Sequence, residues 1–444
     1  MGFDYRSASR HEIGNRARTL EGRRLGDLEI PFVADAGAPG KAEVGHAIEA
    51  YFGIPKNALP EADFPGAGIE LKVVPMRRTG KGLGIKERTV ISMIDFHDLV
   101  LQTWDTAKVR SKLKILFVYF EHLDGRPKAE FPIRRTLMWT PDERTDAFLR
   151  ADWERVQTKV RHGLAHRLSE SDGRIMGPCT KGRDASHLRT QPFSSEKARS
   201  RAFALKPSFT LQLYRDAERH VATSIAPTLD MSRADTFEQQ LRARFQPFVG
   251  RTVGGVGDEL RVPRSIAKSY AAQVARRAFG TSGFKTPIRE FEEMGLTPRI
   301  TRVGVDLMPY ESLSFPAFDY FELLEEDWAD SDLLSKIEYM LLIPVEGAKK
   351  GTPQASCRFG RPVFWKPDAD QLELIRREWE TYRIEIRDGK AKGLTPASAT
   401  VAIHVRPHAR DSDDTAPAPV VGRVIKKSFW LNRDFVQRIL RDAL

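Results

Sequence analysis

The feature that most constrains the fold of this 444-residue chain is an internal repeat. At an offset of 224 positions, the matching pairs are Glu87 and Glu311, Trp104 and Trp328, Ser111 and Ser335, and Lys112 and Lys336. Trp139 and Trp153 lie 14 residues apart, and Trp365 and Trp379 repeat that spacing. Because the length allows two or three domains, the repeat predicts two domains of one fold in tandem, with a boundary near residue 220.

The segment from Asp63 to Pro75 predicts a strand with a charged face. Ile69–Val74 is rich in aliphatic residues, and we expect Pro75 to end the strand. Since side chains alternate across a strand, Glu70 and Lys72 share one face, and the Pro-Gly-Ala-Gly turn can fold Asp63 back toward them. Two carboxylates can hold Mg²⁺, and a neighbouring lysine can orient or deprotonate a water. The pattern is typical of phosphodiester hydrolysis; the alternative is an edge strand with a solvated Glu–Lys pair.

The charge balance favours nucleic acid as a partner. The chain has 71 Lys and Arg against 60 Asp and Glu, which gives a net charge of +11. Residues 155–206 hold twelve Lys and Arg but four acids, so this loop-rich stretch supplies +8 of that charge. Arg183 lies in it, and Lys41 follows a glycine-containing loop. We expect both to contact a DNA backbone, although a solvated surface would look the same.

Cysteine usage and hydropathy predict a cytoplasmic protein without a membrane partner. The two cysteines are far apart, which excludes a disulfide framework and fits a reducing compartment. The N-terminus is polar and predicts no secretory signal. The longest apolar runs, at 115–120 and 340–345, are far shorter than a membrane span.

The candidate site resembles that of the MutH-type endonucleases, a branch of the PD-(D/E)xK nuclease superfamily. The matching text is Gly45-His-Ala-Ile-Glu49, Asp63-Phe64, Gly68-Ile-Glu-Leu-Lys72-Val-Val-Pro75 and Trp104-Asp-Thr-Ala-Lys-Val-Arg-Ser-Lys112. The resemblance implies that Asp63 and Glu70 bind Mg²⁺, with Glu49 as a further carboxylate. Lys72 would position the attacking water and Lys112 would support the phosphate. Without the resemblance, Glu49 is interpreted as an ordinary exposed helix residue.

The second copy keeps the family's recognition text but not its catalytic residues. The aligned positions are Glu70 with Thr297, Lys72 with Arg299, Asp63 with Glu290, and Glu49 with Arg276. An arginine at a ligand position repels a cation, so we expect no working metal site in this copy.

The recognition text of the family is His404-Val-Arg406-Pro407-His408, followed by Lys426. The resemblance implies that Arg406, Pro407 and Lys426 bind DNA, and an arginine at a loop tip suits guanine O6 and N7. An ordinary surface Arg-Pro turn is the alternative. In the first copy Gly177 replaces the family's arginine, while Lys206 matches the closing strand and is expected to contact DNA. Residues 411–419 are acidic and rich in Pro and Ala, and predict a flexible excursion.

We therefore predict two mixed α/β domains of the restriction-endonuclease-like type: a catalytic domain over 1–220 and a degenerate, DNA-binding effector copy over 221–444. The resemblance is greatest to two-domain, GATC-cutting type II restriction endonucleases of restriction–modification systems. It implies Mg²⁺-dependent cleavage of both strands of DNA before the G. It also implies a monomer that pairs or loops on DNA, and a DNA methyltransferase that acts on the same site. Two alternatives stay open: a strand-nicking mismatch-repair endonuclease, and a non-catalytic DNA-binding regulator.

Overall fold

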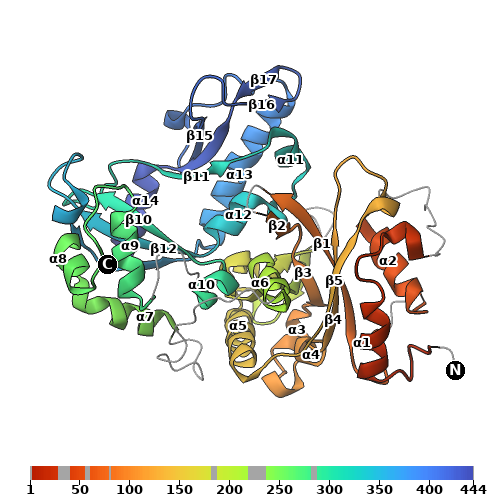
Figure 1. Cartoon of the computed structure of the whole chain (residues 1–444). Coiled ribbons are helices and arrows are strands. Elements are labelled where there is room, and N and C mark those ends of the chain that lie inside the picture. The colour runs from red at the N-terminus through yellow and green to blue at the C-terminus, as the bar shows by residue number, and fades with distance from the viewer. Residues whose placement is uncertain are drawn as a thin grey trace. The chain divides into compact units, whose positions relative to one another are not determined.

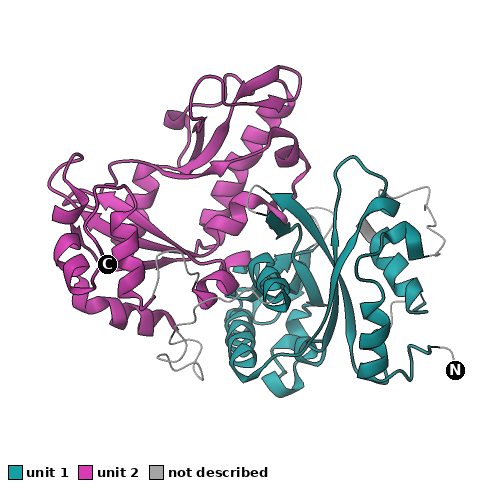
Figure 2. Ribbon diagram, viewed as in Figure 1, with its two compact units in different colours: residues 1–168, 173–221 teal, residues 169–172, 222–444 magenta. Residues whose placement is uncertain are grey.

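The chain forms two compact units (Figure 2): residues 1–168 with 173–221, and residues 169–172 with 222–444. The structure is a computed structural model that describes residues 3–28, 41–55, 61–79, 82–181, 188–218, 237–281 and 288–443, without the side chains of Lys41 and Ala42. The predicted domain boundary near residue 220 lies outside the described residues.

The first unit is a mixed α/β domain (Figure 1). Its helices are α1 (Arg10–Arg18), α2 (Lys41–Tyr51), α3 (Phe96–Leu99), α4 (Lys108–Ser111), α5 (Glu143–Arg161) and α6 (Pro207–Ala217). Its strands are β1 (Glu70–Thr79), β2 (Gly82–Ile85), β3 (Thr89–Met93), β4 (Ile115–Glu121), β5 (Ile133–Trp139), β6 (Met176–Thr180), β7 (Leu188–Gln191), β8 (Ser194–Arg199) and β9 (Arg201–Leu205). They form the sheets β2-β1-β4-β5 and β3-β9-β6 and the hairpin β7-β8.

The second unit is also a mixed α/β domain. Its helices are α7 (Phe237–Phe245), α8 (Val253–Glu259), α9 (Tyr270–Ala278), α10 (Arg289–Met294), α11 (Tyr320–Glu325), α12 (Asp332–Ile337), α13 (Ala369–Arg387) and α14 (Arg433–Asp442). Its strands are β10 (Thr297–Val303), β11 (Leu313–Ala317), β12 (Met340–Glu346), β13 (Arg358–Phe359), β14 (Val363–Trp365), β15 (Ile403–Pro407), β16 (Thr415–Ala418), β17 (Gly422–Ile425) and β18 (Lys427–Leu431). Strands β10-β12-β13 form one sheet, in which β14 also pairs with β12. Strands β11-β18-β15 form another sheet, and β16-β17 form a hairpin.

Strand register shows that the two units pair their central strands in the same way. Glu70 opens β1 opposite Ile115 of the parallel strand β4. Thr297 opens β10 opposite Met340 of the parallel strand β12. The sequence alignment of Thr297 with Glu70 is therefore confirmed by hydrogen-bonded pairing, and Arg299 occupies the position of the lysine two residues after Glu70.

The repeated tryptophans lie in the hydrophobic cores or pack against them, which explains their shared spacing. The rings of Trp104 and Trp153 lie 5.9 Å apart, and those of Trp328 and Trp379 lie 5.3 Å apart. Trp153 and Trp379 project from α5 and α13, two helices of 19 residues each. Each long helix thus packs one tryptophan against another from the segment before the central strand β4 or β12.

Helix α2 positions the first sheet from one side. Ile48 of α2 and Phe52, which directly follows the helix, join a buried cluster with Leu71 of β1 and Leu116 of β4. Figure 1 shows α1 and α2 flanking this sheet. None of the helices in the described ranges is both long and apolar enough to cross a membrane.

Two local predictions were wrong. Strand β1 continues through Pro75 to Thr79. Pro75 has no N–H to donate, and the pairing of β1 with β2 begins only at the next residue, Met76, which lies opposite Ile85. The Pro75 carbonyl accepts a hydrogen bond from the Lys86 N–H. In the second unit, the stretch 411–419, predicted as a flexible excursion, contains a strand, because Thr415–Ala418 pairs with Gly422–Ile425 as a hairpin.

Candidate active site

Glu70 is held between two lysines at the start of β1. Its side chain is almost fully buried, and it accepts hydrogen bonds from Lys72 Nζ at 3.0 Å and Lys112 Nζ at 2.9 Å. Lys72 shares its strand face, whereas Lys112 directly follows α4, just before β4. Because β1 and β4 are parallel, their starting edges meet, and the Glu70 N–H donates to the Lys114 carbonyl at 2.8 Å. Residues 42 positions apart therefore share one carboxylate.

Asp63 reaches the same strand through the turn that precedes it. Phe64 bridges to Ile69, and Gly68 adopts φ +62°, a left-handed conformation that glycine tolerates. Asp63 Oδ2 accepts a hydrogen bond from the Leu71 N–H at 2.7 Å. Burial raises the pKa of the Asp63 carboxyl, and the neighbouring charge of Glu70 adds to this, although the Leu71 hydrogen bond opposes it.

The donors at this edge fit a hard divalent cation. Asp63 and Glu70 offer carboxylate oxygens, and a cation would offset the burial of the Asp63 charge. Throughout the described part of the chain, no three or more His, Cys, Asp and Glu side chains gather as a metal-binding group. Glu49, which is partly exposed on α2, therefore does not complete a triad with these two carboxylates. Mg²⁺ commonly takes one or two carboxylates and fills its other positions with water and phosphate oxygens.

Asp63→Asn should raise the midpoint of thermal unfolding in EDTA at pH 7.5. Because the folded-state pKa of Asp63 is raised, the stability linked to this group is full below the unfolded pKa and is lost as the pH rises through the folded pKa. Asparagine keeps an acceptor for the Leu71 N–H without a buried charge. Scanning calorimetry should show a gain that shrinks as the pH falls, and added Mg²⁺ should stabilise the wild type more than the variant. A lower midpoint for the variant at pH 7.5 would contradict this account.

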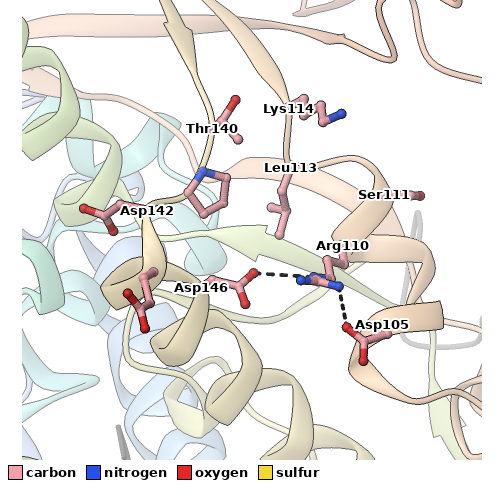
Figure 3. Close-up of a pocket in the computed structure, with 10 residues that line it drawn as sticks. Asp105, Arg110, Ser111, Leu113, Lys114, Thr140, Asp142 and Asp146 are labelled. Atoms are coloured by element: carbon pink, nitrogen blue, oxygen red, sulfur yellow. Dashed lines mark hydrogen bonds and ion pairs between the residues drawn. The ribbon is translucent and has the colours of Figure 1, made fainter. Parts of the chain in front are cut away.

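A polar network fixes the segment that carries Lys112 (Figure 3). Asp146, on α5, accepts a hydrogen bond from Trp104 Nε1 at 3.0 Å and lies 3.5 Å from Arg110 Nε. Arg110 also pairs with Asp105 at 2.6 Å. Asp105, Arg110 and Asp146 line a cavity of about 490 Å³ beside α4 and the start of α5. The network therefore braces α4 immediately before Lys112.

The predicted DNA-binding residues of the second unit lie on and beside β15. Arg406 is exposed, and its guanidinium lies over the Trp430 indole, 5.0 Å from the ring centroid. Such cation–π stacking restricts a long side chain before any ligand binds. Pro407, also exposed, follows it at the end of β15. Lys426 is half-exposed and pairs with Asp414 at 2.6 Å, so a DNA phosphate would have to compete with this carboxylate.

The corresponding strands of the first unit are small and apolar. Cys179 pairs with Ala202 in β9, whereas Arg406 pairs with Ser428 in β18. When β9 of the first unit is matched with β18 of the second, Cys179 therefore occupies the position of Arg406. It lies two residues after Gly177. Cys179, Ala202 and Ala204 form a buried apolar cluster, so the position of Arg406 carries no charge here. The ladder's Arg201 is buried and donates to Thr180 and to the Leu168 carbonyl.

The remaining predicted contacts of the first unit are not at a described surface. Lys206 precedes α6 and is fully buried, so its ammonium does not reach a bound DNA backbone in this conformation. Arg183 and the Lys41 side chain lie outside the described residues.

Residue patterns alone did not reveal Asp146, Arg110 or Trp430. For Asp146 and Arg110, a comparison of the two sequence repeats could have pointed to a role. Asp146 and Arg110 correspond to buried Leu372 and Leu334 at the offsets fixed by the repeated tryptophans and lysines. A charged pair in one copy with an apolar pair in the other indicates a role beyond packing.

Similarity to known proteins places this geometry in a family. The sequence model described as DNA mismatch repair enzyme MutH matches residues 52–152 and 286–378, once in each unit. The type II restriction enzyme Sau3AI of Staphylococcus aureus is 23% identical, and the alignment covers 98% of this chain and 99% of that protein. The DNA mismatch repair protein MutH of Vibrio campbellii is 33% identical over 39% of this chain and 77% of its own length. Its counterpart in Shewanella amazonensis is 31% identical over 46% of this chain and 94% of its own length. The chain therefore belongs to the MutH family, as a site-specific deoxyribonuclease of the restriction-enzyme kind with two tandem MutH-like domains.

Proposed function

We propose that the chain cuts both strands of duplex DNA at GATC in a Mg²⁺-dependent reaction, and that the first unit cuts while the second only binds. The observation that carries this proposal is the contrast at one strand position: Glu70 and Lys72 in β1 against Thr297 and Arg299 in β10. Similarity along the full chain to a type II restriction enzyme favours double-strand cleavage over nicking. GATC, cut before the G, is the target that the sequence resemblance implies.

The side chains divide the work of hydrolysis as follows. Bound Mg²⁺ would polarise the scissile phosphate and lower the pKa of a water. Asp63 and Glu70 present the oxygen ligands, and the Glu70 carboxylate also keeps the ammonium groups of Lys72 and Lys112 at fixed positions. Lys72 orients the attacking water, and Lys112 supports the phosphate as negative charge develops on its oxygens.

The second unit supplies target binding without cutting. An exposed Arg406 braced by Trp430 suits a guanine edge, with Pro407 and Lys426 beside it. Bound to a second target, this unit acts as an effector of the first. We further propose a cytoplasmic monomer that pairs or loops on DNA, with a methyltransferase that protects the host's own copies of the site.

The direct test is digestion of a plasmid with Mg²⁺, or with EDTA as control, followed by sequencing of the ends. The plasmid is prepared from methylating and non-methylating hosts. We expect both strands to be cut before the G of GATC, only with the metal. Single-strand nicks would favour the mismatch-repair alternative, and intact DNA that is nevertheless bound would favour a non-catalytic regulator.

Replacing Arg110 and Asp146 together by leucine should slow cleavage without unfolding the chain. The variant copies the apolar pair Leu334 and Leu372 of the second unit, so the thermal midpoint should stay near that of the wild type. Residues that hold a catalytic group in place commonly change activity about 10- to 100-fold when lost. We expect a loss of that size in single-turnover rate at saturating enzyme, with DNA affinity unchanged. An unchanged rate would show that Lys112 needs no brace.

A further inference from the structure

The degenerate copy of the active site contains an arginine that has no anionic partner in the described part of the chain. Arg299 occupies the place of Lys72, but the carboxylate that Lys72 contacts is replaced by Thr297. Among the described residues, Arg299 makes no hydrogen bond or ion pair, and its guanidinium lies over the Phe315 ring, 5.4 Å from the ring centroid. Burial alone lowers the pKa of Arg299, so no carboxylate of the described chain stabilises its charge. A half-buried cation of this kind is costly unless a ligand supplies the missing charge.

A second polar group on the same strand face also lacks a partner. Thr301 lies two residues after Arg299, so both side chains leave β10 on one side. It is 2% exposed, and its hydroxyl finds no hydrogen-bond partner in the described part of the chain. At the matching position of β1 stands Val74, which is equally buried and needs no partner. The second copy therefore has an extra hydroxyl where the first has an apolar side chain.

A second cation of this site, Lys336, already has a carboxylate partner. Lys336 corresponds to Lys112, but it pairs with Asp332, four residues earlier on α12. In the first unit two ammonium groups share Glu70, whereas here the Arg299 guanidinium has no carboxylate partner among the described residues. A guanidinium presents a planar fork of donors that matches a phosphate. Arg299 lies over the Phe315 ring, and its N–H groups find no hydrogen-bond acceptor among the described residues.

We propose that the degenerate site is a metal-independent phosphate clamp, in which Arg299 takes a DNA backbone phosphate at the position where the first unit holds its carboxylates. The inference rests on the proposed function, since it assumes that the second unit binds DNA. The phosphate supplies the counter-charge that Arg299 lacks and brings acceptor oxygens to the strand face of Thr301. It is not cut, because Thr297 and Arg299 cannot hold a metal ion. The clamp gives the second unit backbone affinity without a divalent cation.

The clamp predicts an effect on binding when no metal is present. The probe is a fluorescent DNA duplex with one GATC, bound by the full chain in EDTA over a series of salt concentrations. Arg299→Met and Arg299→Gln should each weaken binding about tenfold and reduce the slope of log K against log salt by about one, as expected for one lost phosphate contact. Arg299→Lys keeps the charge but not the fork, so it should retain the slope and recover part of the affinity.

Arg264→Met is the matched control, because Arg264 is exposed in the same unit and pairs with Asp258. Thermal unfolding of each variant checks folding, and the two neutral replacements guard against an effect peculiar to one side chain. Affinity and salt slope of both neutral variants equal to those of Arg264→Met would overturn the clamp while leaving the proposed function intact. Failure of the wild type to bind the duplex in EDTA, despite cleavage in Mg²⁺, would also overturn it. Failure to bind or cut in either condition would overturn the proposed function itself.

Discussion

Glu70→Gln is expected to abolish cleavage while leaving DNA binding within about tenfold of the wild type. The amide cannot replace a carboxylate as a Mg²⁺ ligand, and it removes the charge that holds Lys72 at 3.0 Å and Lys112 at 2.9 Å. Binding should persist because most affinity for DNA comes from phosphate contacts elsewhere. Lys72→Ala should behave in the same way. Single-turnover cleavage and fluorescence anisotropy with the same duplex measure the two quantities separately.

The second copy provides the control for this prediction. Lys336→Ala removes the counterpart of Lys112 in the unit that has Thr297 in place of Glu70, so cleavage should continue near the wild-type rate. Cutting at full rate by Lys72→Ala would remove this lysine from the mechanism. Cutting by Glu70→Gln would mean that the metal is held elsewhere.

Arg406→Ala should lower the preference for a GATC duplex over one without the site. A good bidentate contact to a base discriminates by about 1–3 kcal/mol, or roughly 5- to 150-fold in the ratio of dissociation constants. The reason to place this contact at Arg406 is its exposure and its stacking over Trp430 at 5.0 Å. Anisotropy in a Glu70→Gln background, which prevents cleavage, gives both dissociation constants.

Arg376→Ala is the matched control for Arg406. Arg376 belongs to the same unit, lies on α13 and pairs with Glu373. Its loss should leave the ratio of dissociation constants unchanged. If Arg406→Ala keeps the full ratio, the target is recognised elsewhere in the chain.

Local periodicity was enough to predict part of the site. Alternation of side chains along β1 puts Glu70 and Lys72 on one face, and the 3.0 Å contact confirms that geometry. The tryptophan spacing likewise predicts matching cores. These features depend on residues near one another in the chain, or on a repeat that can be counted.

Contacts across long separations could not be derived from the pattern alone. Lys112 meets Glu70 only because β1 and β4 pair in parallel, and the resemblance rather than the spacing pointed to it. Asp146 reaches Trp104 through tertiary packing, with no local signal at either residue. Lys206 was expected at the DNA surface, but the fold buries it between β9 and α6 in the chain. Solvent exposure and strand register depend on the whole domain, so a single motif does not determine them.

The central claim is that one copy cuts while the other binds a target and assists it. Two targets on one DNA raise the local concentration of the second, and its occupation of the effector unit biases the catalytic unit toward activity. The most direct measurement compares cleavage rates of two plasmids of equal length, with one and two GATC sites, at enzyme concentrations below the dissociation constant. The account predicts faster cutting of the two-site plasmid by the wild type, and equal rates for the two plasmids with Arg406→Ala. Equal rates with the wild type would contradict it and would leave the second unit as a scaffold.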